Sequence, residues 1–119
     1  MEQLATTNKP DLSLPRWEML PDIDLYMDQV TMLLEKYLGI LLQKEGEKFI
    51  TASMINNYVK QGIVPAPVKK RYHRCHLAYL IMVVSLKQIF SMDEINRLLE
   101  NELKDKEIQK VYDDFCTAQ

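Results

Sequence analysis

The sequence has few of the residues that cross-link a chain, and it has no long hydrophobic run. Its 119 residues include only two cysteines, Cys75 and Cys116, which lie far apart. A disulfide framework normally shows more cysteines at closer spacing, so we predict two reduced thiols. The longest apolar run, residues 77–84, is far shorter than the about 20 residues that cross a bilayer. These absences argue against a disulfide-rich secreted domain and against a membrane-spanning protein.

A secretory signal and a zinc motif are also missing. Residues 1–13 are polar, without the basic start and apolar core of a signal peptide, so we expect a cytoplasmic protein. No CxxC pair is present. His73, Cys75 and His76 lie close together, but a zinc site needs a fourth ligand and none is near in sequence. We therefore predict no metal and no cofactor, and we expect both histidines to face phosphates.

Acidic residues are absent from residues 48–92, although the whole chain has a net charge of -2. Every Asp and Glu lies outside this segment, so a basic centre lies between acidic flanks. Such a charge distribution is typical of a surface that attracts nucleic acid. The basic residues within it are Lys48, Lys60, Lys69, Lys70, Arg71, Arg74 and Lys87, with His73 and His76.

Prolines and helix-capping residues divide the chain into segments. We predict an extended arm over residues 1–21, pinned by Trp17, a main domain over residues 22–101 and a C-terminal amphipathic helix over residues 102–119. The first helix is expected to run from Asp22 or Asp24 to about Lys44, with Gly39 packed closely against a neighbour and Gly46 as its C-cap. A mainly α-helical fold follows.

The second helix is short and has one polar face. Thr51 is its N-cap candidate and Gly62 its stop, while the apolar positions Ile55, Tyr58 and Val59 are expected to face the core. Helical spacing then turns the remaining polar side chains outward. These outward residues are Ser53, Asn56, Asn57 and Lys60.

Four more segments follow the second helix. Two prolines and the run Lys69–Lys70–Arg71 favour an exposed loop or short hairpin over residues 63–73. The apolar segment from Arg74 to Phe90 predicts a central helix. Ser91 and Glu94 have the spacing of a capping box, which starts a fourth helix to about Asn101. The tail from Lys104 predicts the last amphipathic helix.

A short polar helix followed by a basic loop is typical of a DNA reader. An Asn amide can pair bidentately with the edge of adenine in the major groove, and Asn56 and Asn57 are the candidates. Lysines and arginines of the loop neutralise phosphates. We predict double-stranded DNA as the partner, with helix 52–61 in the major groove and a wing over residues 66–74 on the backbone. The candidate DNA-binding residues are Ser53, Asn56, Asn57, Lys60, Lys69, Lys70, Arg71, Tyr72, His73 and Arg74.

Two stretches, MINNYVKQGIVP at residues 54–65 and KRYHRCHL at residues 70–77, resemble MerR regulators. The match lies in Tyr58, Gly62, Ile63, Pro65, Arg71 and Tyr72, and it continues into SMDEINRLL at residues 91–99. More closely, the chain resembles an uncharacterised bacterial family of MerR-like domains, domain of unknown function 1836. The resemblance implies a MerR-like winged helix-turn-helix fold in a transcriptional regulator.

The chain departs from MerR proteins in two ways. Asn56 and Asn57 replace the usual Arg-Tyr of the recognition helix, and only about twenty residues follow Leu99, so the long dimerising coiled coil and the effector domain are missing. Any homodimer is therefore expected to form through the first helix or through the C-terminal helix. For the C-terminal helix, the expected contacts are Ile108, Val111, Tyr112 and Phe115.

An enzyme is not expected, because no phosphate-binding loop, nucleophile elbow or paired-histidine motif occurs. The carboxylates of the tail are better explained as a solvated helix face than as an acid–base pair. One alternative stays open, which is a non-catalytic helical protein-protein interaction module whose basic loop only keeps it soluble. A binding surface that gathers the candidate residues would favour DNA over this alternative.

Overall fold

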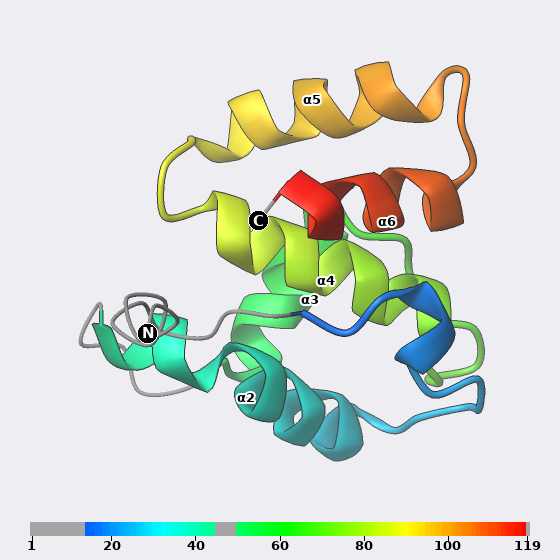
Figure 1. Cartoon of the computed structure of the whole chain (residues 1–119). Helices are drawn as coiled ribbons and strands as arrows, with labels where there is room; N and C mark the ends of the chain where they lie inside the picture. Colours follow the sequence, from blue (N-terminus) through cyan, green and yellow to red (C-terminus); the bar gives the residue numbers. More distant parts are fainter. Residues whose placement is uncertain (1–13, 45–49, 119) are drawn as a thin grey trace, which may run out of the picture.

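Helices make up nearly all of the regular structure. The computed structural model describes residues 14–44 and 50–118, with the backbone alone for residues 40–44 (Figure 1). Over these ranges β-structure is limited to isolated bridges, so the predicted mainly helical fold is confirmed. The elements are a 3-10 turn, η1 (Trp17–Met19), and five helices: α2 (Met27–Lys44), α3 (Ala52–Lys60), α4 (Arg74–Leu86), α5 (Met92–Leu103) and α6 (Ile108–Ala118).

Side-chain caps start α3 and α5 at the predicted residues. Thr51 Oγ1 accepts a hydrogen bond from the Met54 N–H at 3.2 Å. At α5, Ser91 Oγ accepts from the Glu94 N–H at 3.2 Å, and Glu94 Oε1 accepts from the Ser91 N–H at 2.8 Å. These bonds satisfy amides that have no partner within the helix, which stabilises each helix by about 1 kcal/mol.

The start of α2 differs from the prediction. Leu25 pairs with Tyr72 through two backbone hydrogen bonds of 2.8 Å, so the chain is extended where a first helical turn was expected. Gln29 Oε1 then accepts a hydrogen bond from the Tyr26 N–H at 2.8 Å. Because residues 21–26 are tied to a distant segment, the helix begins only at Met27.

The apolar helix α4 lies at the centre, as the sequence predicts. It packs against α2 on one side and α6 on the other (Figure 1). Burial around almost its whole circumference explains why its sequence lacks an amphipathic pattern. Its fully buried apolar residues, each at most 3% exposed, are Leu77, Ala78, Leu80, Ile81, Met82, Val83 and Val84.

The segment around η1 is fastened to α6. The Trp17 N–H donates to Asp113 Oδ1 at 2.9 Å, and the Tyr112 hydroxyl donates to the Pro15 carbonyl. Trp17 also packs against the core. Trp17 therefore pins this part of the chain to the body, as expected. The predicted arm before Leu14 lies outside the described residues, as does Gly46.

The inner face of α6 belongs to the core of the protein itself. Val111 is 4% exposed and Tyr112 is fully buried, while Ile108 and Phe115 pack partly buried against the same cluster. The prediction that these side chains make dimer contacts is therefore wrong for Val111 and Tyr112, which offer no surface to a second chain. A contact through the first helix stays a prediction.

None of the helices in the described ranges is both long and apolar enough to cross a bilayer.

Gly39 does not make the close contact that the sequence suggested. No atom of the described residues lies within 4 Å of the position that a Cβ would take there, outside its own helix. Within the described residues the glycine therefore lowers the stability of α2 without a packing benefit. The space around Gly39 is large enough for the methyl group of an alanine.

We expect Gly39→Ala to raise the free energy of unfolding by about 0.5 to 1 kcal/mol, because alanine loses less backbone entropy in a helix. Urea unfolding measures this change. Gly62→Ala is the matched control, since Gly62 has a φ of 80° that alanine adopts only with strain, and it should lose stability. A midpoint for Gly39→Ala at or below that of the parent would contradict the open space at this position.

Candidate nucleic-acid interface

Helix α3 presents a polar face that the core holds from behind. Ile55 is fully buried and Tyr58 is 3% exposed. Lys87, just beyond α4, donates from Nζ to the Tyr58 hydroxyl at 3.0 Å. The outward face is exposed as predicted and lines a shallow depression of about 390 Å³. Its lining residues are Ser53, Met54, Asn56, Asn57 and Lys60.

A Schellman turn ends α3 at the predicted glycine. The Gly62 N–H donates to the Val59 carbonyl at 3.0 Å, and the Ile63 N–H donates to the Tyr58 carbonyl at 3.1 Å. This pattern requires a left-handed residue after the helix, which Gly62 supplies with its φ of 80°. Ile63 and Val64 follow and are both buried. The turn therefore fixes the direction in which the chain leaves α3.

A minimal hairpin follows the prolines, over residues 68–71. Val68 and Arg71 exchange backbone hydrogen bonds of 3.0 and 2.9 Å. The two residues between them, Lys69 and Lys70, have φ values of 52° and 65°, as a type I′ turn requires. The left-handed region disfavours side chains other than Gly, Asn and Asp, at about 1 to 2 kcal/mol per residue. The turn thus holds two exposed lysines at its tip in a strained conformation.

The next residue, Tyr72, ties this hairpin to the N-terminal part of the chain. Its backbone forms the bridge to Leu25, and its side chain is only 3% exposed. Tyr72 was predicted among the DNA-binding residues, but its side chain belongs to the core. Tyr72 therefore holds the hairpin in place from the core and offers no surface to a ligand.

Three of the predicted DNA-binding residues face acidic residues of the segment before α2. Asp24 lies 2.8 Å from His73 Nδ1 and 3.6 Å from the Arg71 guanidinium, which also stacks over the Tyr26 ring at 5.3 Å. Arg74 is held more deeply, with its side chain 23% exposed. Part of the positive charge that the sequence assigned to DNA is therefore neutralised within the chain.

The contacts of Arg74 show how firmly this segment is held. Its Nε donates to the Leu20 carbonyl at 3.3 Å, its Nη2 lies 3.9 Å from Asp22 Oδ2, and its guanidinium lies over the Trp17 ring at 5.4 Å. Lys60, Lys69 and Lys70, in contrast, form no ion pair with any residue that the structure describes. Their charges are therefore not neutralised by an acidic residue in this part of the chain.

His76 is buried rather than turned toward phosphates, which corrects the prediction. It is 3% exposed. Its Nδ1 accepts a hydrogen bond from the His73 N–H at 2.9 Å, and its Nε2 lies 3.0 Å from the Ala66 carbonyl. Burial is the main cause that lowers the pKa of the imidazole. The neutral ring thus joins the loop before the hairpin to the first turn of α4.

The histidines of the His73, Cys75 and His76 cluster contact other groups of the protein. Both ring nitrogens of His76 are engaged in hydrogen bonds, and burial raises the pKa of the Cys75 thiol. Within residues 14–44 and 50–118, no three His, Cys, Asp or Glu side chains are grouped closely enough to hold a metal ion. His73 and His76 form the N-terminal cap of α4 instead.

Comparison with known proteins gives a family and no function. The sequence model of one family, described as Domain of unknown function (DUF1836), matches residues 15–115. This match confirms the resemblance to the uncharacterised family that the sequence motifs indicated. No curated protein and no solved structure matches the chain.

Proposed function

Because the chain belongs to the DUF1836 family, whose function is not assigned, we propose a function from its surface: a sequence-specific double-stranded DNA-binding protein that regulates transcription. The observation that carries the proposal is α3, a helix capped at both ends whose exposed face is polar, free of acid and includes Lys60. A helix of this kind fits the major groove.

The order of elements supports a MerR-like winged helix-turn-helix arrangement. A short helix, a glycine turn, a hairpin, a central apolar helix and a serine-capped helix follow one another, as the resemblance to MerR regulators implies. In this proposal α3 is the recognition helix and the Val68–Arg71 hairpin is the wing. The wing is smaller than the predicted range of residues 66–74.

The two parts of the surface have different tasks in this proposal. Asn56 and Asn57 read base edges, because amides can pair with adenine. Lys69 and Lys70 contact phosphates, which adds affinity without sequence preference. Arg71, His73 and Arg74 are assigned a smaller share, since they already pair with Asp22 and Asp24. Tyr72 is left out because it is buried.

We expect Lys70→Ala to weaken binding to every duplex. The affinity should also depend less on salt, with the negative slope of log K against log salt becoming shallower by about 1. Asn56→Ala should leave that slope unchanged but narrow the gap between preferred and random DNA by roughly 1 to 3 kcal/mol. Fluorescence anisotropy over a salt series measures both, with a labelled random duplex and a duplex selected from a random library as probes.

Lys110→Ala is the matched control for charge, because it removes one lysine from α6, where Lys110 pairs with Asp114 at 3.0 Å. It should leave DNA binding as in the parent. If Lys70→Ala behaves like Lys110→Ala at every salt concentration, the wing has no role. If the parent itself binds no duplex, the interaction-module alternative takes the place of this proposal.

A further inference from the structure

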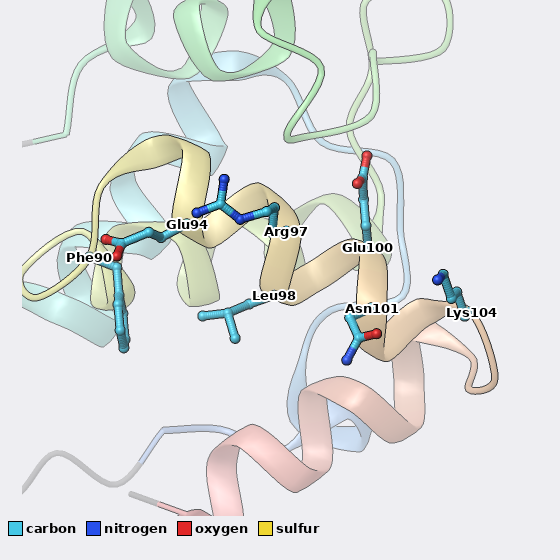
Figure 2. Close-up of a pocket in the computed structure, with 7 residues that line it drawn as sticks. All are labelled: Phe90, Glu94, Arg97, Leu98, Glu100, Asn101 and Lys104. Carbon is cyan, nitrogen blue, oxygen red and sulfur yellow. The ribbon is translucent and has the colours of Figure 1, made fainter.

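The outer face of α5 carries an apolar depression. Ile95 and Leu99 are buried on the inner face, whereas Leu98 is 42% exposed and Phe90, just before the helix, is 37% exposed. These two exposed side chains line a depression of about 530 Å³ (Figure 2). Large apolar side chains gathered in one exposed hollow mark interaction surfaces more often than isolated ones do. No residue of α3 or of the hairpin lines it.

Charges of alternating sign surround this hollow. In chain order they are Glu94 in the first turn, Arg97, Glu100 and, just beyond the helix, Lys104. Arg97, Glu100 and Lys104 form no ion pair with any described residue. One oxygen of Glu94 caps the helix. The acidic start and the basic end give the face a direction.

We propose that α5 pairs with α5 of a second copy of this chain, antiparallel and around a two-fold axis beside Leu98. In that register the residue numbers of two facing positions add up to 197, so Arg97 of each copy faces Glu100 of the other. Lys104 of each copy then faces Asp93 in the acidic first turn of the other copy. Leu98 lies next to the axis in both copies and supplies the apolar contact at the centre.

The charge order selects this arrangement over a parallel one. In a parallel pair in register, Arg97 would face Arg97 and Lys104 would face Lys104. Every pair of charged residues would then repel. A two-fold axis uses the same patch on both subunits, which therefore has to be complementary to itself. The outer face of α5 meets this requirement only when the helices run in opposite directions.

The interface is small, which sets the expected strength. A helix of 12 residues is about 18 Å long, and contacts below about 1,200 Å² are usual for weak association. We therefore expect a dissociation constant in the micromolar range or above. The dimer is independent of the proposed DNA binding, because its residues differ from those of α3 and the hairpin.

Charge reversal at the central pair tests the register. Arg97→Glu makes residues 97 and 100 both acidic, and Glu100→Arg makes them both basic, so each variant alone should associate at least tenfold more weakly than the parent. A mixture of the two variants places opposite charges together again and should associate at least as tightly as the parent. Sedimentation equilibrium of the full chain over a concentration series measures all three. Lys36→Glu, an exposed reversal on α2, is the control and should associate as the parent does.

Three results would overturn the proposal. The first is a parent that stays monomeric at the highest concentration. The second is a dimer that persists in Arg97→Glu, in Glu100→Arg and in Leu98→Glu, because all three change the proposed contact. The third is a mixture of the two reversed variants that stays as weak as either alone. Circular dichroism checks that the variants stay folded, and the mixture decides the register even if Leu98→Glu unfolds.

Discussion

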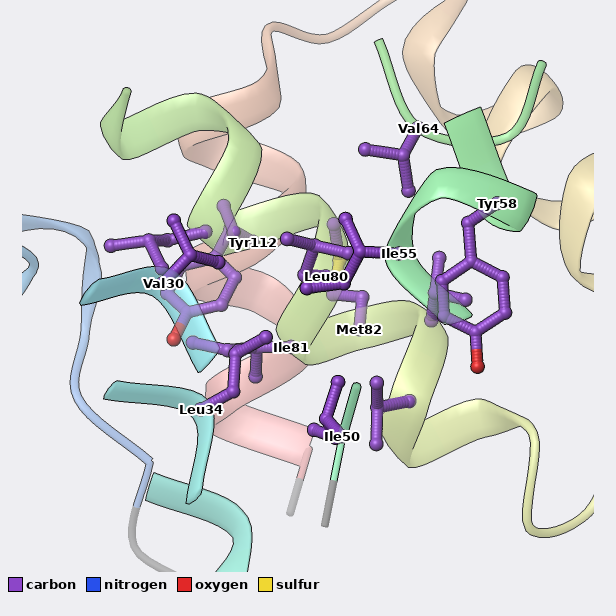
Figure 3. Close-up of a cluster of buried hydrophobic side chains, with 14 of the residues drawn as sticks. Val30, Leu34, Ile50, Ile55, Tyr58, Val64, Leu80, Ile81, Met82 and Tyr112 are labelled. Atoms are coloured by element: carbon purple, nitrogen blue, oxygen red, sulfur yellow. The ribbon is translucent and has the colours of Figure 1, made fainter. Parts of the chain in front are cut away.

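Leu80→Ala should lower the free energy of unfolding by roughly 2 to 5 kcal/mol. Leu80 is fully buried in α4, where it packs near Ile55 of α3 within the cluster that also contains Leu34 of α2 (Figure 3). Removing its side chain loses apolar burial and leaves a cavity that the surrounding helices fill only in part. Domains are stabilised by only about 5 to 15 kcal/mol in total, so the loss is large.

Leu98→Ala is the matched control for this prediction, because it makes the same chemical change at a side chain that is 42% exposed. Its effect should stay within about 0.5 kcal/mol. Urea unfolding at low protein concentration measures both variants without any contribution from self-association. A loss below about 0.5 kcal/mol for Leu80→Ala would contradict the central place of α4 and the packing of α3 on it.

Signals within a few residues of each other predict the helix ends well. The Thr51 cap, the Ser91–Glu94 box and the Gly62 turn each depend on hydrogen bonds between neighbours in the sequence. Such bonds need only residues that are close together in the sequence, so their residue pattern favours them whatever the rest of the fold. The central helix was predictable for a related reason, since its long apolar run has to be buried on all sides.

Contacts between distant residues decided the points where prediction failed. Residues 48–92 contain no acid, yet Asp22 and Asp24 come to lie against its arginines because Leu25 pairs with Tyr72. Sequence separation hid this neutralisation. The sequence also predicted that His76 faces phosphates. Its burial could not be predicted, because its contact with the Ala66 carbonyl depends on how the loop folds back.

The amphipathic pattern of α6 misled for a different reason. An apolar stripe shows that a face is buried but not what covers it. Here α4 and the segment around η1 cover Val111 and Tyr112, so the stripe belongs to the core. On α5 the residues of the inner face, Ile95 and Leu99, are also buried. Only the structure shows that Leu98 lies outside this face. We therefore propose a dimer surface on α5 and not on α6.

The protein should lose stability on acidification through His76. The Nδ1 atom accepts a hydrogen bond from the His73 N–H, so a proton on Nδ1 would break this bond and leave a charge in a buried site. His73 is itself cationic when protonated and adds to the cost, while Cys75, beside Nδ1, stays a neutral thiol because burial raises its pKa. The edge of the Tyr72 ring covers the imidazole from another side.

The direction of this effect follows from the lowered pKa of His76. In the unfolded chain the imidazole takes up its proton near its ordinary pKa of 6.5, whereas the folded chain resists protonation. Below about pH 6.5 the unfolded state therefore binds more protons, so the free energy of unfolding falls as the pH falls. The contribution is complete above this pH and is lost as the pH drops through the lowered pKa of the folded state.

Urea unfolding between about pH 7.5 and pH 5 should show this loss in the parent and a smaller one in His76→Gln, which cannot titrate. Glu94 and Asp114 act only at lower pH, since hydrogen bonds to Ser91 and to Lys110 lower the pKa of their carboxyl groups. The chain has two histidines, so proton NMR can follow the His76 ring directly. A His76 pKa at or above 6.5, or equal pH dependence in the parent and His76→Gln, would show that the buried cap does not exist in solution.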